Sequence, residues 1–466
     1  MNKKRLVKDV LVAFLAQGVA LLVSVLTTLL APKVLGVEGY GYWQLFLFYG
    51  TYVGLFQFGV IDGLYLICGG KTRDEIDKES VSFSFRFVVV SQTIVGCVLA
   101  FIVAPFMPDV SRGFVVAFVG LYTLLSNATN FFSYLFQTMN ETRRSSLVTL
   151  VDRTCFLLAL LVLFVLRTDD FRPFIVVCLA SRVIACGFGV FLGKDVCFVR
   201  CPDFKRGCRF LFETIKVGVI LVLANLADQL VIGSVRASVD GHWGIEVFSV
   251  VSLSFSMVSF VMTFVSQVSM VLFPALRRVS DEGLNRFYRV AKSGLSLALP
   301  IVYVLYCPLA LFIGAWLPDY SASIGYLALL MPVCVFDAQM NICGTTVLKV
   351  TRREKQLLGI NIMAILLAAV GALIGSLVFN NIELTLLSAL VAIAVRCYTA
   401  DYTLRSEFGG INVPLAVGEL ILALLFVACS STFGFMVSFV VSLAAYGVFL
   451  FLNRKNLSTI VHELRS

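Results

Sequence analysis

The stretch from residue 83 to residue 104 reads FSFRFVVVSQTIVGCVLAFIVA and carries a single charge, Arg86. A helix needs about 20 mostly apolar residues to cross the hydrocarbon core of a bilayer. Lipid offers no hydrogen bonds, so a spanning segment must satisfy its own backbone groups, as a helix does. This stretch therefore predicts a transmembrane helix.

Runs of the same kind fill the rest of the chain. Of 466 residues, 59% are hydrophobic and 14% are charged, whereas soluble domains have about 25% charged residues. The apolar runs cover residues 10–31, 42–67, 83–104, 113–136, 150–166, 173–193, 214–234, 244–272, 293–315, 323–348, 357–378, 384–404, 413–429 and 434–452. The sequence thus predicts an all-α polytopic membrane protein with about fourteen transmembrane helices.

The distribution of Lys and Arg predicts the orientation, because these residues collect in cytoplasmic loops. With the N-terminus inside, about 31 of the 37 lie on the cytoplasmic side. Five lie outside, namely Lys33, Arg112, Arg167, Arg172 and Arg236, and Arg182 lies mid-membrane. We expect both termini in the cytoplasm. The net charge of +9 then reflects topology and not nucleic-acid binding, which would need a clustered basic groove with aromatic residues.

The sequence contains little that indicates an enzyme. The predicted outer loops are short, the longest about ten residues, and no phosphate-binding loop or nucleophile–base set is present. Cys197, Cys201 and Cys208 share one inner loop, but their spacing is not that of a zinc site and no His is near. We expect neither an enzyme nor a bound metal or cofactor.

Internal repeats predict a duplication. Residues 37–46, VEGYGYWQLF, align without gaps on residues 239–248, VDGHWGIEVF, at an offset of 202. Residues 142–144 match residues 351–353 at an offset of 209, and Arg182 matches Arg396 at 214. Six helices per repeat is an even number, so the two copies would share one orientation across the membrane.

The predicted domains follow from this duplication. They are a six-helix lobe at 1–193, a cytoplasmic linker at 194–213, a second six-helix lobe at 214–404, and helices thirteen and fourteen with a cytoplasmic tail at 405–466. Two such lobes around a central cleft would suit alternating access.

Charged residues inside the predicted helices are the first candidate site residues, since a charge in a membrane is costly and usually functional. Arg182 and Arg396 could hold an anionic head group, because guanidinium matches phosphate oxygens, or they could form structural salt bridges. Asp62, Asp228 and Asp337 could couple transport to a cation or pair with an Arg. For Glu419 we expect a structural role.

Polar stripes are the second set. Hydroxyl groups repeat along one predicted helix, at Ser249, Ser252, Ser256, Ser259, Thr263 and Ser266. Other polar faces hold Asn225, Asp228 and Gln229, or Gln17, Ser24 and Thr28. These residues could solvate sugars, with Lys33 and Arg236 as further cations near the substrate. The alternative is that they hold helices together.

Several segments resemble Wzx-type polysaccharide flippases. They are APKVLGVEGYGYWQ at 31–44, FGVIDGLYL at 58–66 with Gly69 and Gly70, ANL at 224–226, IGSVR at 232–236, VSLS at 251–254 and LFPALRR at 272–278. The resemblance implies the fold of the multidrug/oligosaccharidyl-lipid/polysaccharide exporter superfamily, with two six-helix lobes in a V plus two extra helices. Asp228 departs from the family pattern, in which an uncharged residue is usual.

The resemblance also implies a cargo and a location. The cargo is an oligosaccharide linked to undecaprenyl pyrophosphate, turned from the inner to the outer leaflet of the bacterial cytoplasmic membrane for surface polysaccharide such as O-antigen or capsule. Membrane lipid, a polysaccharide polymerase and chain-length proteins are the partners it suggests. The alternative is a cation-coupled multidrug or small-molecule antiporter of the same superfamily, although a mixed Arg and hydroxyl lining suits that alternative less well.

Overall fold

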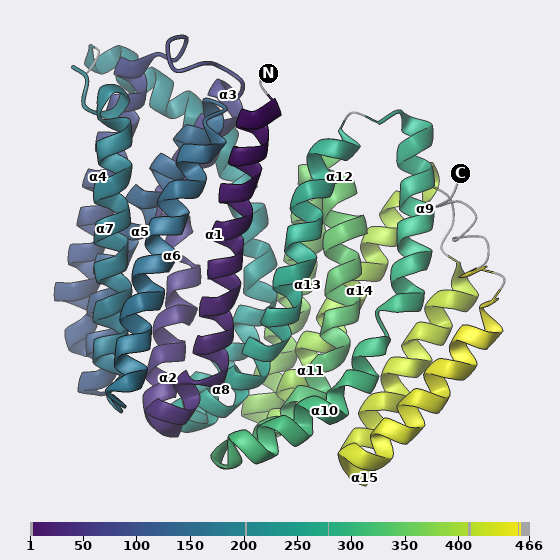
Figure 1. The fold of residues 1–466 in the computed structure, drawn as a ribbon. Helices are drawn as coiled ribbons and strands as arrows, with labels where there is room; N and C mark the ends of the chain where they lie inside the picture. The colour runs from purple at the N-terminus through teal and green to yellow at the C-terminus, as the bar shows by residue number, and fades with distance from the viewer. Residues whose placement is uncertain (1–2, 201–202, 278, 409–411, 455, 458–466) are drawn as a thin grey trace. The chain divides into compact units, whose positions relative to one another are not determined.

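The computed structural model describes residues 3–200, 203–277, 279–408, 412–454 and 456–457. The chain forms two compact units, Met1–Leu226 and Ala227–Ser466, and each is described separately (Figure 1). The division falls inside a long helix, whereas the sequence predicted a linker at 194–213. That helix already begins at Phe204.

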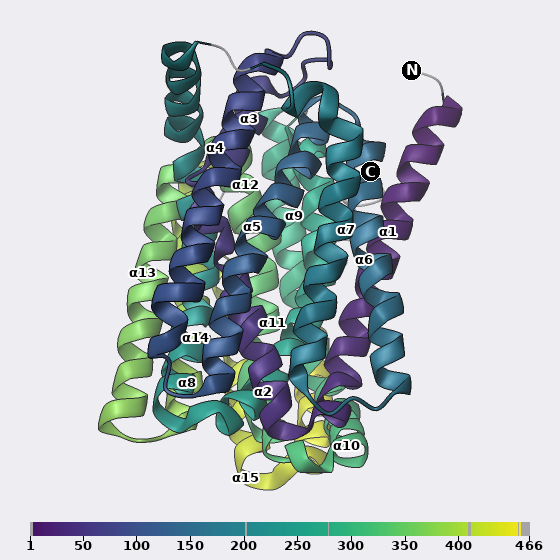
Figure 2. The ribbon, with the colours of Figure 1, turned by 90° about the vertical axis from the view of Figure 1, so that its left-hand side faces the viewer.

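The first unit is a bundle of membrane-length helices with short connections. Its elements are α1 (Lys3–Leu29), α2 (Ala31–Thr51), η1 (Val53–Gln57), α3 (Val60–Cys68), α4 (Lys78–Cys97), η2 (Val98–Val103), η3 (Ala104–Phe106), α5 (Val110–Thr138), α6 (Thr142–Val165), α7 (Phe171–Cys197) and the beginning of α8 (Phe204–Leu276). Helix α6 packs between α1 and α7, and α5 contacts α4 and α7 (Figure 2). A cluster of buried aromatic rings, including Phe85, Phe131 and Phe132, fills the space between α4 and α5.

The second unit holds the remainder of α8 and the elements that follow. They are α9 (Asp281–Ala298), α10 (Ile301–Trp316), η4 (Pro318–Tyr320), α11 (Ala322–Gln339), η5 (Met340–Thr345), α12 (Thr346–Val350), α13 (Glu354–Leu373), η6 (Ile374–Val378), α14 (Ile382–Phe408) and α15 (Val413–Leu452). Helix α14 packs on α11 and α13, and α15 packs on α10 and α11. Helix α15 is therefore integral to this unit.

The helices confirm a multi-pass membrane protein, while the count of fourteen stays a prediction. In the described part of the chain, ten helices are long and apolar enough to span a membrane, and α1 with α2 and η1 forms a further bent pair. Two of the ten, of 66 and 40 residues, are much longer than one span needs. Both contain a sharp internal kink.

Three glycines make the same kind of corner. Gly36 in α2 (φ 66°, ψ −176°), Gly244 in α8 (φ 80°, ψ −172°) and Gly434 in α15 (φ 76°, ψ 175°) interrupt otherwise helical backbone. Only glycine adopts this region readily. A Cβ atom at any of the three would meet no other atom within 4 Å, so backbone conformation and not crowding requires glycine there. In Figure 1 the two halves of α15 lie side by side.

The predicted single helix at 42–67 is broken in the structure. Residues 32–41, expected as a loop, are mostly helical, with Pro32 in the first turn of α2. The chain then leaves the α conformation at Phe58 (φ 55°) and Gly59 (φ 82°) before α3 begins. A Cβ on Gly59 would collide with the backbone of Gly218 and Val219 in α8, so both the left-handed backbone and the close approach of α8 require glycine at this break.

Kinks and left-handed helix ends recur at matching places in the two units. They support the duplication and change the residue offset between its two copies. The kink glycines Gly36 and Gly244 are 208 residues apart. Left-handed residues end helices at Asn140 and Arg352, 212 apart, and at Arg167 and Asn380, 213 apart. The backbone offsets thus rise smoothly from 208 to the 214 of Arg182 and Arg396, and they replace the offsets of 202 and 209 read from sequence alone.

Candidate functional site

Arg396 lies at the centre of a buried polar cluster in the second unit. Its side chain is 2% exposed and projects from α14. Nε donates to Asn361 Oδ1 of α13 at 2.9 Å, and Nη1 lies 3.3 Å from Asp337 Oδ1 of α11. Nη2 pairs with Asp228 of α8. Four helices therefore converge on one guanidinium.

The Arg396 cluster holds two carboxylates against one cation. The Asp337 side chain is largely buried, and the Asp228 side chain is 40% exposed. Asn341 adds an amide donor to Asp337 Oδ2 at 3.3 Å. With both carboxylates ionised, the cluster has a formal charge of −1, so a proton or another cation would balance it.

Arg182 has a corresponding but sparser environment in the first unit. Its side chain, on α7, is 13% exposed. Nη1 lies 3.4 Å from Asp152 Oδ2 of α6, and Nη2 donates to the hydroxyl of Tyr122 on α5 at 3.4 Å. The guanidinium also lies over the Tyr122 ring, 5.6 Å from its centroid. Both contacts are long for charge-assisted hydrogen bonds.

The two arginines take partners from equivalent helices. In the first unit these helices are α5 and α6, and in the second they are α11 and α13, the copies predicted by the duplication. The partner chemistry differs, since Arg182 contacts a tyrosine and an aspartate on these helices and Arg396 contacts an aspartate and an asparagine. Each arginine therefore has a partner within its own unit, and its depth in the membrane stays a prediction.

The remaining predicted charged residues are distributed more widely. Asp62 of α3 is buried and accepts a hydrogen bond from Gln57 Nε2 at 3.1 Å. Lys33 is exposed on the first turns of α2. Arg236 donates to the hydroxyl of Ser252 at 3.0 Å and lies over the ring of Phe248, 5.2 Å from its centroid. The latter contacts join the two arms of α8 on either side of Gly244.

The hydroxyl stripe of α8 divides into a buried and an exposed part. Ser249 and Ser252 are fully buried, whereas Ser259 is exposed. Ser256 and Thr263 donate to carbonyls four residues earlier in their own helix, a bond that satisfies the hydroxyl without a ligand. Asn225 is exposed and Gln17 is half-buried. Ser259 and Asn225 are therefore the more accessible members of the predicted polar faces.

Sequence reasoning missed three partners of the two arginines, Tyr122, Asp152 and Asn361, and a second cluster. Asp152 lies two residues inside the predicted run 150–166, where a charge looked superficial, and Asn361 is uncharged. Lys292 pairs with Asp401 at 2.6 Å, and both lie at the margins of predicted runs. The signal that the sequence offered was the spacing of these residues from other polar residues on the same helices. That spacing identifies partners only when the packing of the helices is known.

Solved structures resemble this chain over most of its length. The lipid II flippase MurJ, in an inward closed conformation, gives a TM-score of 0.65 at 12% identity and covers 97% of this chain and 100% of its own. An inward-facing multidrug resistance MATE family transporter of the MOP superfamily gives 0.62 at 12% identity, over 85% and 94% of the two chains. A mutant of the Vibrio cholerae MATE transporter VcmN gives 0.57 at 14% identity, over 87% and 97%.

The chain has a MOP-type transporter fold. No family model matches the sequence, and no curated protein matches it significantly. At 12–14% identity the structural likenesses establish the fold alone. This fold agrees with the one that the Wzx resemblance implied.

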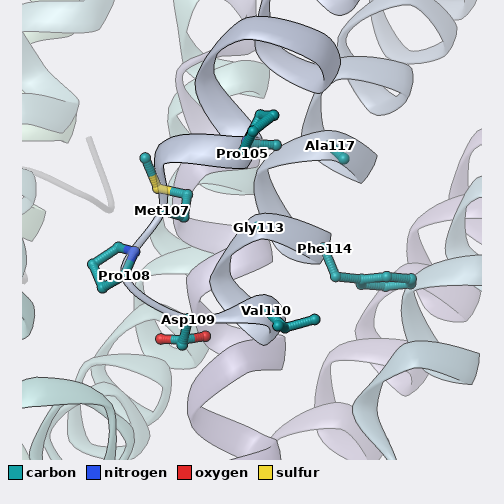
Figure 3. Close-up of a pocket in the computed structure, with 9 residues that line it drawn as sticks. Pro105, Met107, Pro108, Asp109, Val110, Gly113, Phe114 and Ala117 are labelled. Carbon is teal, nitrogen blue, oxygen red and sulfur yellow. The ribbon is translucent and has the colours of Figure 1, made fainter.

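One surface hollow of about 520 Å³ lies at the turn between η3 and α5 of this MOP-type fold (Figure 3). All its lining residues belong to the single stretch 104–117 and none is a predicted site residue. Asp109 is its charged member and caps α5 by accepting from the backbone N–H of Arg112 at 2.6 Å. The carboxylate is thus occupied by the helix end, and we assign no substrate to this hollow.

Proposed function

We propose that this protein flips an oligosaccharide linked to undecaprenyl pyrophosphate from the inner to the outer leaflet of the bacterial cytoplasmic membrane by alternating access. The observation that carries the proposal is the likeness to the lipid II flippase MurJ over 97% of the chain. It agrees with the sequence resemblance to Wzx-type polysaccharide flippases. A polysaccharide polymerase and chain-length proteins would then receive the product.

The extent of the likeness favours a flippase over a drug exporter. A coverage of 97% leaves 3% of 466 residues, or about 14, outside the match with MurJ. Helix α15 has 40 residues, so most of it must be included. The matches with MATE transporters leave 13–15% of this chain uncovered, enough to omit the whole of α15.

Arg182 is the stronger candidate for the pyrophosphate. A guanidinium has five N–H donors, and Arg182 engages one carboxylate and one hydroxyl, each at 3.4 Å. Arg396 has three partners and is almost fully buried. Arg182 therefore keeps donors for phosphate oxygens, whereas Arg396 serves better as a charge partner.

Other predicted residues have supporting roles in this proposal. The accessible polar side chains of Ser259, Asn225 and Gln17 would solvate sugar hydroxyls. Ser252 is buried and bonded to Arg236, and Ser256 bonds within its own helix, so these two predicted residues suit that role less well. Lys33 and Arg236 would attract the anionic carrier. Asp228 and Asp337 would couple transport to a cation through their shared pairing with Arg396, and Asp62 stays a charge-pair or coupling candidate.

The second candidate is a cation-coupled multidrug or small-molecule antiporter. It is favoured by the TM-score of 0.62 to a MATE family transporter and by the net negative charge of the Arg396 cluster. Such a protein would exchange an organic cation for a proton or metal cation and would leave lipid-linked sugars in place.

Flipping by purified protein tests the proposal. In proteoliposomes with a fluorescent lipid-linked oligosaccharide, Arg182→Ala and Arg182→Gln should each slow flipping about tenfold or more, because a charge-assisted hydrogen bond contributes about 1.5–3 kcal/mol. Arg172→Gln is the matched control, since Arg172 lies on the same helix α7 and its side chain is 47% exposed; it should flip at the wild-type rate. Full flipping by both Arg182 variants would remove Arg182 from the head-group site. No flipping by the wild type, with exchange of organic cations, would favour the antiporter.

A further inference from the structure

Glu419 is a fully buried carboxyl group in the second unit. It lies near the start of α15 and is 0% exposed. Its Oε1 accepts from the side-chain amide of Gln339, and its Oε2 is 3.3 Å from the hydroxyl of Ser296. Within the described part of the chain, Glu419 has no cation within ion-pair distance. A buried carboxylate without a counter-ion is costly, and binding a proton removes the cost.

The neighbours of Glu419 suit both of its protonation states. A hydroxyl can donate or accept, so Ser296 can donate to the carboxylate and can accept from the protonated acid. Gln339 donates to the other oxygen in either state. The hydroxyl of Tyr303 is buried and has no hydrogen-bond partner in the described chain, and the Tyr303 ring stacks on Phe426 of α15, the helix that carries Glu419, at 4.8 Å. It offers a further donor.

A polar row on α9 connects this carboxyl to a second charged pair. Tyr288, Lys292 and Ser296 follow each other at intervals of four residues, and so lie on one helix face. Tyr288 donates to Asp401 Oδ1 at 2.9 Å, and Lys292 Nζ lies 2.6 Å from Asp401 Oδ2. Because Lys292 is already neutralised by Asp401, it does not serve as the counter-ion of Glu419. Tyr288, Lys292 and Ser296 each carry an exchangeable proton, so the row provides successive proton carriers along α9.

The site also touches a helix defect. Gln339 is the last residue of α11, and the π-helical turn η5 begins at the next residue. Such turns are often found at functional sites, and they change the packing of a helix locally. A change in charge at Glu419 would act on η5 through the Gln339 amide.

We propose that Glu419, with Gln339, Ser296 and Tyr303, forms a proton-binding site that is filled through the α9 row of Tyr288, Lys292 and Ser296. The proton comes from water and binds Glu419 Oε2, where Ser296 accepts from it. The titratable groups that face Glu419 are Lys292 from α9, Tyr303 from α10, and Cys397, Tyr398 and Asp401 from α14. The existence of this proton site does not depend on the proposed function. The further statement that Glu419 gains and loses its proton within a transport cycle rests on the proposed function.

Infrared difference spectroscopy on the purified full-length protein tests the site directly. Lowering the pH should produce the carbonyl stretch of a protonated carboxyl group, which is separate from carboxylate bands. Glu419→Gln, nearly the same size, should abolish this band. Gln339→Leu should move it to higher frequency, because a carbonyl that loses a hydrogen-bond donor has a stronger double bond. Glu383→Gln, at an exposed carboxyl on α14, should leave the band in place.

The outcomes separate this inference from the proposed function. A band that persists unchanged in Glu419→Gln, or one that is absent from the wild type across the pH range in which it stays folded, overturns the site. Suppression of the band by sodium at constant pH would instead identify a metal-cation site and also overturns the proposal. A band that behaves as expected in a protein that flips no lipid-linked oligosaccharide would reject the proposed cargo and keep the proton site. Size-exclusion profiles verify that each variant is folded.

Discussion

Arg396 shows how one side chain organises its surroundings. Removing one partner of a buried ion pair leaves the others uncompensated and costs about 3–5 kcal/mol. Arg396→Met leaves Asp337 without its cation, so we expect a loss of unfolding free energy toward the lower end of that range, about 3 kcal/mol, because Asp228 is partly exposed. Denaturation of the detergent-solubilised protein, followed by its intrinsic fluorescence, measures the loss.

A double variant separates pairing from packing. Asp337→Asn in the Arg396→Met background removes the unpaired charge and should recover part of the lost stability, because the two sites are coupled. Arg405→Met is the matched control on the same helix, since Arg405 is exposed, and should change stability by no more than about 0.5 kcal/mol. Equal losses in Arg405→Met and Arg396→Met would contradict a specific role for the cluster.

At the residue scale the sequence singled out both arginines but not most of their partners. A single Arg within an apolar run is unusual, and in the structure Arg396 is 2% exposed and Arg182 is 13% exposed. Their partners lie 30 and 59 residues away along the chain, on other helices. Such pairs depend on helix rotation and packing, which hydropathy does not encode.

At the scale of helices, the kink glycines give a sharp prediction. Gly244→Ala forces a Cβ into backbone that non-glycine residues avoid, and we expect a loss of about 1–3 kcal/mol. Gly241→Ala, three residues earlier in regular helix, should instead be neutral or stabilise by up to about 1 kcal/mol. A Cβ at either position meets no neighbouring atom, so the difference isolates backbone conformation. Thermal unfolding of the two variants measures it, and similar effects in both would contradict this account of the corner.

Helix boundaries were predictable where charges interrupt apolar runs and were missed where backbone geometry does. The runs at 113–136, 323–348 and 384–404 fall within α5, the stretch from α11 to α12, and α14. The break between η1 and α3 left no hydropathy signal, because Phe58 and Gly59 are themselves apolar. The alignment of the two repeats shows the same difference. Similar residues at 37–46 and 239–248 gave a less reliable offset than the backbone kinks at Gly36 and Gly244.

For the whole molecule, composition predicted a polytopic membrane protein and the Wzx resemblance implied the MOP-type fold, but composition does not identify the cargo. Any protein that moves a polar substrate across lipid needs apolar helices and a few polar side chains, so the same composition serves drugs and lipid-linked sugars. Helix α15 packs into the second unit, where Phe426 stacks on Tyr303 at 4.8 Å and Glu419 is buried. The sequence did not predict this packing, because hydropathy identifies a helix but not the helices beside it.

Loss of the whole protein distinguishes the two candidate functions in a cell. In a deletion strain we expect sugar-loaded lipid carrier to accumulate on the inner leaflet, because the polar head group cannot cross the hydrocarbon core unaided at a useful rate. Leaflet-selective labelling of the carrier in membrane vesicles measures this, and the wild-type gene supplied in trans should reverse it. Normal surface polysaccharide together with increased sensitivity to cationic drugs would point to the antiporter instead. A strain complemented with the Arg182→Gln variant should accumulate the carrier as the deletion does, which would tie the cellular defect to the proposed head-group residue and not to the absence of the protein.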